Sequence, residues 1–99
     1  MTQGKDLTHM SPETSAHAPQ LDPILVGRVI SRFRREKGVT QEVLSGLADI
    51  GRTHLSAIEN GDRKPTLETL YRLSGALDTS MSAIVLEIER EIERQRGMN

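Results

Sequence analysis

The order of helix-ending and helix-starting residues is the feature of this sequence that most constrains its fold. Apolar residues recur at helical spacing from Ile24 onward, and turn-forming residues interrupt them at short intervals. The interruptions are Gly38 before Thr40, the segment Asp49-Ile50-Gly51, and Gly61 before Thr66. Glycine ends helices in the left-handed conformation, and threonine caps the start of a following helix. The sequence therefore predicts an all-α fold with helices over residues 24–37, 41–48, 52–60, 67–78 and 80–96.

The apolar residues of the first four helices define the predicted core. They share helical spacing within each segment, and they are Ile24, Leu25, Val26, Val29, Ile30 and Phe33, then Val43, Leu44, Leu47 and Ala48, then Leu55 and Ile58, then Leu67, Leu70, Tyr71, Leu73 and Leu77. Phe33 and Tyr71 are the only aromatic residues, so aliphatic helices fit this composition better than a β-sandwich.

Length and composition predict a single domain with a short extension at each end. A chain of 99 residues has room for one core. Residues 1–23 hold prolines and polar residues with few large apolar side chains, which predicts a flexible N-terminal arm. We expect a compact domain over residues 24–86 and a C-terminal extension of the last helix over residues 87–99.

The sequence also limits the cellular compartment and the kinds of chemistry that we expect. It contains no cysteine, which excludes disulfides, thiolate catalysis and a cysteine-ligated metal. No basic segment is followed by an apolar run, and no apolar run has the roughly 18–20 residues that span a bilayer. We therefore expect a cytoplasmic protein with no membrane partner.

Charge is distributed unevenly along the chain, although the net charge is only −1. Residues 24–66 contain eight basic and five acidic residues, a net charge of +3, and each flank carries a net charge of −2. The middle segment is therefore where a polyanion would bind.

The helix over residues 52–60 has an outer face that is polar but carries few charges. Arg52, Thr53, His54, Ser56, Ala57 and Asn60 occupy this face. A solvated helix more often carries Glu/Lys pairs, whereas short hydrogen-bonding side chains with an arginine suit the reading of base edges in a major groove. Plain solvent exposure is the alternative for each of these residues.

Three segments resemble a known family: TQEVL at residues 40–44, LSAIENG at 55–61 and RKPTLETL at 63–70. Together they are similar to the Cro and phage-repressor type of helix-turn-helix domain, in the xenobiotic-response-element family of bacterial transcriptional regulators. Asp49 stands where the family usually has glycine, and Gly51 where it usually has serine or threonine. The resemblance implies a compact five-helix, lambda-repressor-like DNA-binding domain with an extended C-terminal helix.

The resemblance also implies a function and a set of site residues. The chain is expected to be a sequence-specific transcriptional regulator, of the repressor type, that binds double-stranded DNA as a homodimer on a palindromic operator. The implied base contacts are Arg52, Thr53, His54 and Ala57, with phosphate as the alternative for His54. The implied phosphate contacts are Gln41, Asn60, Arg63 and Lys64, for which capping or loop solvation is the alternative. Arg34 and Glu59 match a family pair that forms a structural salt bridge.

The last helix carries a short heptad-like seam formed by Met81, Val85, Ile88 and Ile92. Packing on the domain's own core is the alternative for Val85 and Ile88, together with Ile84. Ile92, however, lies farther along the helix than we expect a small core to reach. The seam therefore predicts a dimer interface.

Catalysis is the function class that the sequence supports least. The histidines are His9, His17 and His54, and no metal-ligand spacing, carboxylate–histidine spacing or glycine-rich phosphate loop accompanies them. We expect no enzymatic activity, no cofactor and no metal. The alternative to an operator-binding regulator is an antitoxin-type module that neutralises a toxin partner and regulates its own operon. An acidic arm and tail would suit a basic partner of that kind.

Overall fold

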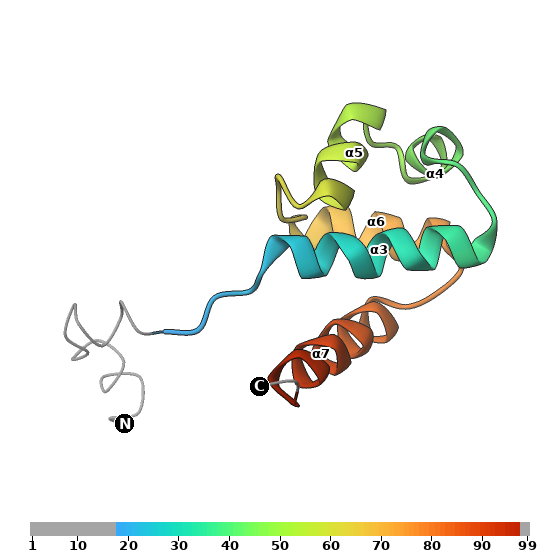
Figure 1. Ribbon diagram of the computed structural model, residues 1–99. Coiled ribbons are helices and arrows are strands. Elements are labelled where there is room, and N and C mark those ends of the chain that lie inside the picture. The colour runs from blue at the N-terminus through green and yellow to red at the C-terminus, as the bar shows by residue number, and fades with distance from the viewer. Residues whose placement is uncertain (1–17, 98–99) are drawn as a thin grey trace, which may run out of the picture.

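The computed structural model describes residues 18–97, and within them the chain is all-α, as predicted (Figure 1). Its helices are α3 (Pro23–Lys37), α4 (Gln41–Ala48), α5 (Arg52–Asn60), α6 (Leu67–Ala76) and α7 (Met81–Gly97). Most of the N-terminal arm predicted over residues 1–23 lies outside the described residues. None of these helices is both long and apolar enough to cross a membrane.

Local capping explains the helix boundaries that the sequence predicted. Thr40 Oγ1 accepts a hydrogen bond from the Val43 amide at 3.1 Å, and Thr66 Oγ1 accepts one from the Thr69 amide at 3.0 Å. Gly38 and Gly61 end their helices at φ 81° and 84°, where glycine meets no steric penalty. The ends of α3 and α5 and the starts of α4 and α6 are therefore confirmed, and the end of α4 and the start of α5 also match the prediction.

The remaining boundaries, namely the start of α3, the end of α6 and both ends of α7, differ from the prediction by one or two residues. Helix α3 begins at Pro23, because Asp22 Oδ1 caps the Ile24 amide at 2.9 Å and proline is favoured in a first turn. Helix α6 ends at Ala76, not at Asp78, since Asp78 has left-handed geometry at φ 57°. An ion pair of 2.6 Å joins Asp78 Oδ2 to Lys37 Nζ at the end of α3.

The core is narrower than helical spacing predicted. Residues buried from all five helices form one apolar cluster: Leu25, Val26, Val29, Ile30, Leu44, Ala48, Leu55, Ile58, Leu70, Leu73, Leu77, Ile84 and Ile88. Five residues predicted to face this core are exposed instead, namely Ile24, Val43, Leu47, Leu67 and Tyr71. A short helix such as α4 contacts the core along one narrow face. Leu44 and Ala48 lie on that face and are buried, whereas the adjacent Val43 and Leu47 are exposed.

Helix α3 crosses the molecule between α5 on one side and α7 on the other (Figure 1). Its contact with α5 is close at Gly27, where a Cβ atom would lie 2.3 Å from the carbonyl oxygen of Ile58 and 2.6 Å from that of Glu59. Any larger side chain there would push the two backbones apart. Gly27 therefore allows α3 and α5 to pack with their backbones in close contact.

Helix α7 packs along α3, which changes the interpretation of the apolar seam. Ile88 belongs to the buried core, and Met81 and Ile92 pack against it. The expectation that Ile92 lies beyond the reach of the core was wrong, because α7 stays alongside α3. An ion pair of 3.0 Å between Arg32 and Glu87 also joins the two helices. Val85 is the seam residue that remains exposed, and its neighbour Leu86 is exposed as well.

Candidate nucleic-acid interface

Helices α4 and α5 form a helix-turn-helix unit, joined by Asp49, Ile50 and Gly51. Asp49 adopts left-handed geometry at φ 56°, which aspartate tolerates better than most residues, and Ile50 packs against the core. Leu55 and Ile58 anchor α5 in the core, so its opposite face is directed outward. On that face Arg52 and Thr53 are exposed, and His54 and Ala57 are half-buried.

A shallow groove of about 330 Å³ runs along the outer face of α5. Its lining contains five of the residues singled out from the sequence, namely Gln41, Arg52, Thr53, Ala57 and Asn60. The structure thus brings the start of α4 and the outer face of α5 together. His54 does not line this groove, and Arg63 and Lys64 are exposed on the loop between α5 and α6.

Two further residues line the same groove, Ser56 and Asp62. Sequence reasoning placed Ser56 on the outer face of α5 without assigning it a role, and it gave Asp62 no role. The position of Asp62, directly after the LSAIENG segment, was the signal available for it. Asn60 Nδ2 lies 3.5 Å from Ser56 Oγ, a distance typical of a weak hydrogen bond at most. Asn60 therefore keeps its capacity to bind another group.

A buried carboxylate beneath this groove ties three helices together. Arg34 of α3 donates to both oxygens of Glu59, from Nε at 2.7 Å and from Nη2 at 3.0 Å. The expected pair is thus present and bidentate, and only 4% of the Glu59 side chain is exposed. Arg34 Nη1 also donates to the carbonyl oxygen of Val39 at 2.9 Å, which holds the loop before α4.

Gln41 belongs to the same network, which sequence reasoning did not foresee. Its Nε2 donates to Glu59 Oε1 at 3.0 Å, so the amide is held at the start of α4. An amide nitrogen carries two hydrogens, and only one is used in this bond. The second hydrogen and the positive end of the α4 dipole remain available to an anion.

The surroundings of Glu59 keep it ionised. Burial alone would raise the pKa of this carboxyl, but hydrogen bonds from Arg34, Gln41 and Ser31 and the charge of Arg34 outweigh that effect and lower its pKa. At neutral pH the ionised carboxylate of Glu59 is therefore the acceptor that orients both Arg34 and Gln41.

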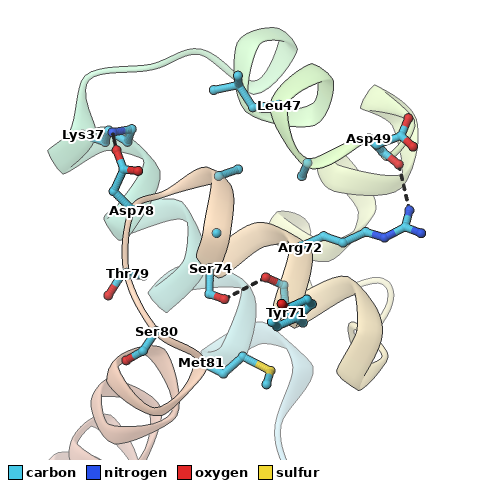
Figure 2. Close-up of a pocket in the computed structure, with 13 residues that line it drawn as sticks. Lys37, Leu47, Asp49, Tyr71, Arg72, Ser74, Asp78, Thr79, Ser80 and Met81 are labelled. Atoms are coloured by element: carbon cyan, nitrogen blue, oxygen red, sulfur yellow. Dashed lines mark hydrogen bonds and ion pairs between the residues drawn. The ribbon is translucent and has the colours of Figure 1, made fainter.

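A larger groove of about 950 Å³ lies between α4, α6 and the turn before α7 (Figure 2). Leu47, Tyr71 and Met81 contribute apolar surface to it. Its rim is held by the ion pair of Lys37 with Asp78, which lowers the pKa of Asp78, and by Arg72 Nη1, which donates to the carbonyl oxygen of Asp49 at 3.2 Å. None of the residues predicted to contact DNA lines this groove.

Comparison with known proteins places this arrangement among helix-turn-helix proteins. A family model described as "Helix-turn-helix" matches residues 30–84. The uncharacterized HTH-type transcriptional regulator y4dJ of Sinorhizobium fredii is 44% identical over 61 residues, which cover 62% of this chain and 79% of that protein. Control protein C.MunI of a Mycoplasma species is 35% identical over 69 residues, which cover 69% of this chain and 93% of that protein.

Solved structures of similar fold include two bacterial regulators. The restriction-modification controller protein C.AhdI from Aeromonas hydrophila superimposes with a TM-score of 0.63 at 28% identity, covering 66% of this chain and 98% of that one. The clp gene regulator ClgR from Corynebacterium glutamicum gives a TM-score of 0.73 at 26% identity, covering 81% of this chain and 84% of that one. The lambda-repressor-like arrangement expected from the sequence is therefore shared with solved regulators.

Proposed function

This chain belongs to the helix-turn-helix family of transcriptional regulators, and on that premise we propose that it represses transcription by binding a palindromic operator in double-stranded DNA as a homodimer. The observation that supports this most directly is the groove on α5, which is lined by Arg52, Thr53 and Ala57 together with Gln41 and Asn60. We assign the chain no catalytic role.

The side chains on α5 suit direct contact with bases in the major groove. Arg52 is exposed at the start of the helix and can donate two hydrogen bonds to O6 and N7 of a guanine. Thr53 offers a hydroxyl and a methyl group, and Ala57, one turn later, lets a base edge approach closely. His54 does not line the groove, so we place it at the edge of the surface that is proposed to contact bases.

The residues around α5 suit contact with the DNA backbone. Gln41 is held by Glu59 at the start of α4, and Asn60 stands at the end of α5. Arg63 and Lys64 add positive charge on the exposed loop that follows. Contacts of this kind position a protein on DNA without reading sequence.

A homodimer is the assembly that makes such a small interface specific. One domain of this size contacts few base pairs, whereas two copies related by a two-fold axis read two half-sites. The described residues leave apolar surface exposed on α7 at Val85 and Leu86, and on α6 at Leu67 and Tyr71. We propose that the second copy covers Val85, the exposed edges of Met81 and Ile92, and the neighbouring face of α6.

Selection of bound sequences from random duplex DNA tests this function. We expect enrichment of one palindromic motif with half-site centres about 34–36 Å apart, the length of one helical turn. Enrichment of an asymmetric motif would contradict the two-fold homodimer. The absence of any enriched motif would contradict sequence-specific binding altogether.

A further inference from the structure

Helix α3 carries a line of arginines outside the groove on α5. Arg28, Arg32 and Arg35 are spaced by four and three residues, so they share one face of the helix. Arg28 and Arg35 are exposed, and Arg32 is half-buried against α7. Seven residues of helix rise by about 10 Å, which is close to the axial length of three base pairs.

Most charges around this line are already compensated. The three arginines line a shallow groove of about 480 Å³ together with Ser31, Glu59 and Glu91. Each carboxylate in this lining has an arginine partner outside it, because Glu59 pairs with Arg34 and Glu91 with Arg94 at 2.6 Å. Arg32, in turn, pairs with Glu87.

Two arginines of this groove therefore carry a positive charge that no ion pair compensates. Among residues 18–97, neither Arg28 nor Arg35 is part of an ion pair. The charge of Arg28 does act on Glu91, whose pKa is lowered chiefly by its hydrogen bond from Arg94. The lining as a whole keeps an excess of positive charge that an anion could neutralise.

This arginine groove adjoins the groove on α5 through one contact. Glu59 lines the arginine groove and accepts the hydrogen bond of Gln41, and Gln41 lines the groove on α5. The two grooves are therefore neighbours on the surface, and DNA bound at Gln41 can extend toward Arg28 and Arg35.

We propose that Arg28 and Arg35 bind phosphate groups of the DNA that flanks the segment contacted by α5, an inference that rests on the proposed function. The planar guanidinium group binds phosphate through two parallel hydrogen bonds. A contact of this kind lengthens the DNA site without reading more bases. The bound chemistry is the phosphodiester backbone of duplex DNA.

Salt dependence of DNA binding tests the inference. The variants are Arg28→Gln, Arg35→Gln and the double variant, and the control is Arg90→Gln, an exposed arginine of α7 that lines neither groove. Each phosphate contact contributes about 0.9 to the slope of log K against log salt concentration. On the selected operator with long flanks, we expect each single variant to reduce the slope by about 1.8 per homodimer, because both copies lose the contact.

Further measurements distinguish a lost contact with the DNA backbone from a change in the structure of the protein. Circular dichroism and thermal midpoints of the variants should match wild type, and Arg28→Lys and Arg35→Lys should largely keep the wild-type slope, since they keep the charge. With the flanks removed from the duplex, wild type should give the same slope as the double variant. An unchanged slope for the double variant on long flanks overturns this inference alone. A wild type that prefers no duplex overturns the proposed function and the inference with it.

Discussion

Gly27 is the residue at which substitution should perturb the packing of α5 most directly. A Cβ atom there would lie 2.3 Å from a backbone oxygen of α5, and backbone cannot move aside as a flexible side chain can. We expect Gly27→Ala to lower the free energy of unfolding by about 1–3 kcal/mol or more, as overpacked sites do. Urea denaturation measures this difference.

Gly75 provides the matched control for Gly27, since it lies within α6 and nothing stands within 4 Å of a Cβ built there. Gly75→Ala should raise the free energy of unfolding by about 0.5–1 kcal/mol, because alanine loses less conformational entropy in a helix. Equal effects of the two substitutions would show that Gly27 is not a close-contact position.

Glu59 is the second residue with a large expected effect, because removing it leaves Arg34 without its buried partner. We expect Glu59→Ala to cost about 3–5 kcal/mol in the free energy of unfolding. Glu93→Gln is the control, since it removes an exposed pair with Arg96 and such pairs contribute about 0–1 kcal/mol. Comparable losses for Glu59→Ala and Glu93→Gln would contradict the role of Glu59.

The stabilisation from Glu59 should also depend on pH. Its pKa is lowered in the folded protein, so the stabilisation is fully present above the unfolded pKa, about 4.3, and is lost as pH falls through the lower folded pKa. The difference in unfolding free energy between wild type and Glu59→Gln should therefore shrink below about pH 4. Urea denaturation at several pH values measures it, and a constant difference would contradict the lowered pKa.

At the residue scale, the sequence predicted which residues form an ion pair better than it predicted how closely neighbouring helices approach. The pair of Arg34 and Glu59 followed from a family resemblance, and the structure contains it. The bond from Gln41 to Glu59 and the close approach at Gly27 were not predicted. Helical spacing assigns a residue to a face of its own helix, but it does not give the distance to a neighbouring helix.

At the scale of helices, boundaries set by local capping were predicted well. Thr40, Thr66 and Gly61 act through neighbouring backbone groups, so the sequence around them carries the information. The end of α6 was missed because it involves Asp78, whose partner Lys37 is 41 residues away. Sequence spacing also overestimated the buried width of α4 and α6, since the width of a core depends on how helices cross.

Helix α5 carries the prediction about sequence reading. Arg52→Ala should weaken binding to the selected operator by about 1–3 kcal/mol and relax the preference at one base pair in each half-site. Binding to random duplex should change much less. Fluorescence anisotropy with both duplexes measures the two affinities.

Arg63→Ala is the control for Arg52, because Arg63 lies on the exposed loop after α5 and is proposed to contact phosphate only. It should weaken binding to specific and random duplex equally. The same equal loss for Arg52→Ala would show that Arg52 contacts the backbone and reads no base.

At the scale of the whole molecule, the exposed apolar residues carry the prediction about assembly. Val85→Glu and Tyr71→Glu place a charge on the face proposed for the second copy, where burying it unpaired is costly. We expect sedimentation to show both variants shifted toward monomer, with helical circular dichroism retained. Ile92→Glu should shift the same way but also lose stability, since Ile92 packs against the core.

Val43→Glu is the control for these substitutions, because Val43 is exposed on α4, outside the proposed dimer face. It should sediment as wild type does. A wild type that remains a monomer at tens of micromolar would contradict the dimer, and a shift caused by Val43→Glu would place the interface elsewhere.

The position of α3 between α5 and α7 has a consequence for DNA geometry (Figure 1). Because one helix contacts both the element proposed to read bases and the element proposed to meet the second copy, the proposed homodimer would hold its two α5 helices at a fixed rotation about the duplex axis. One extra base pair between half-sites turns the second half-site by about 35°. Such a homodimer favours one rotation of the second half-site relative to the first. DNA with a lengthened spacer must therefore be untwisted before both copies can bind it.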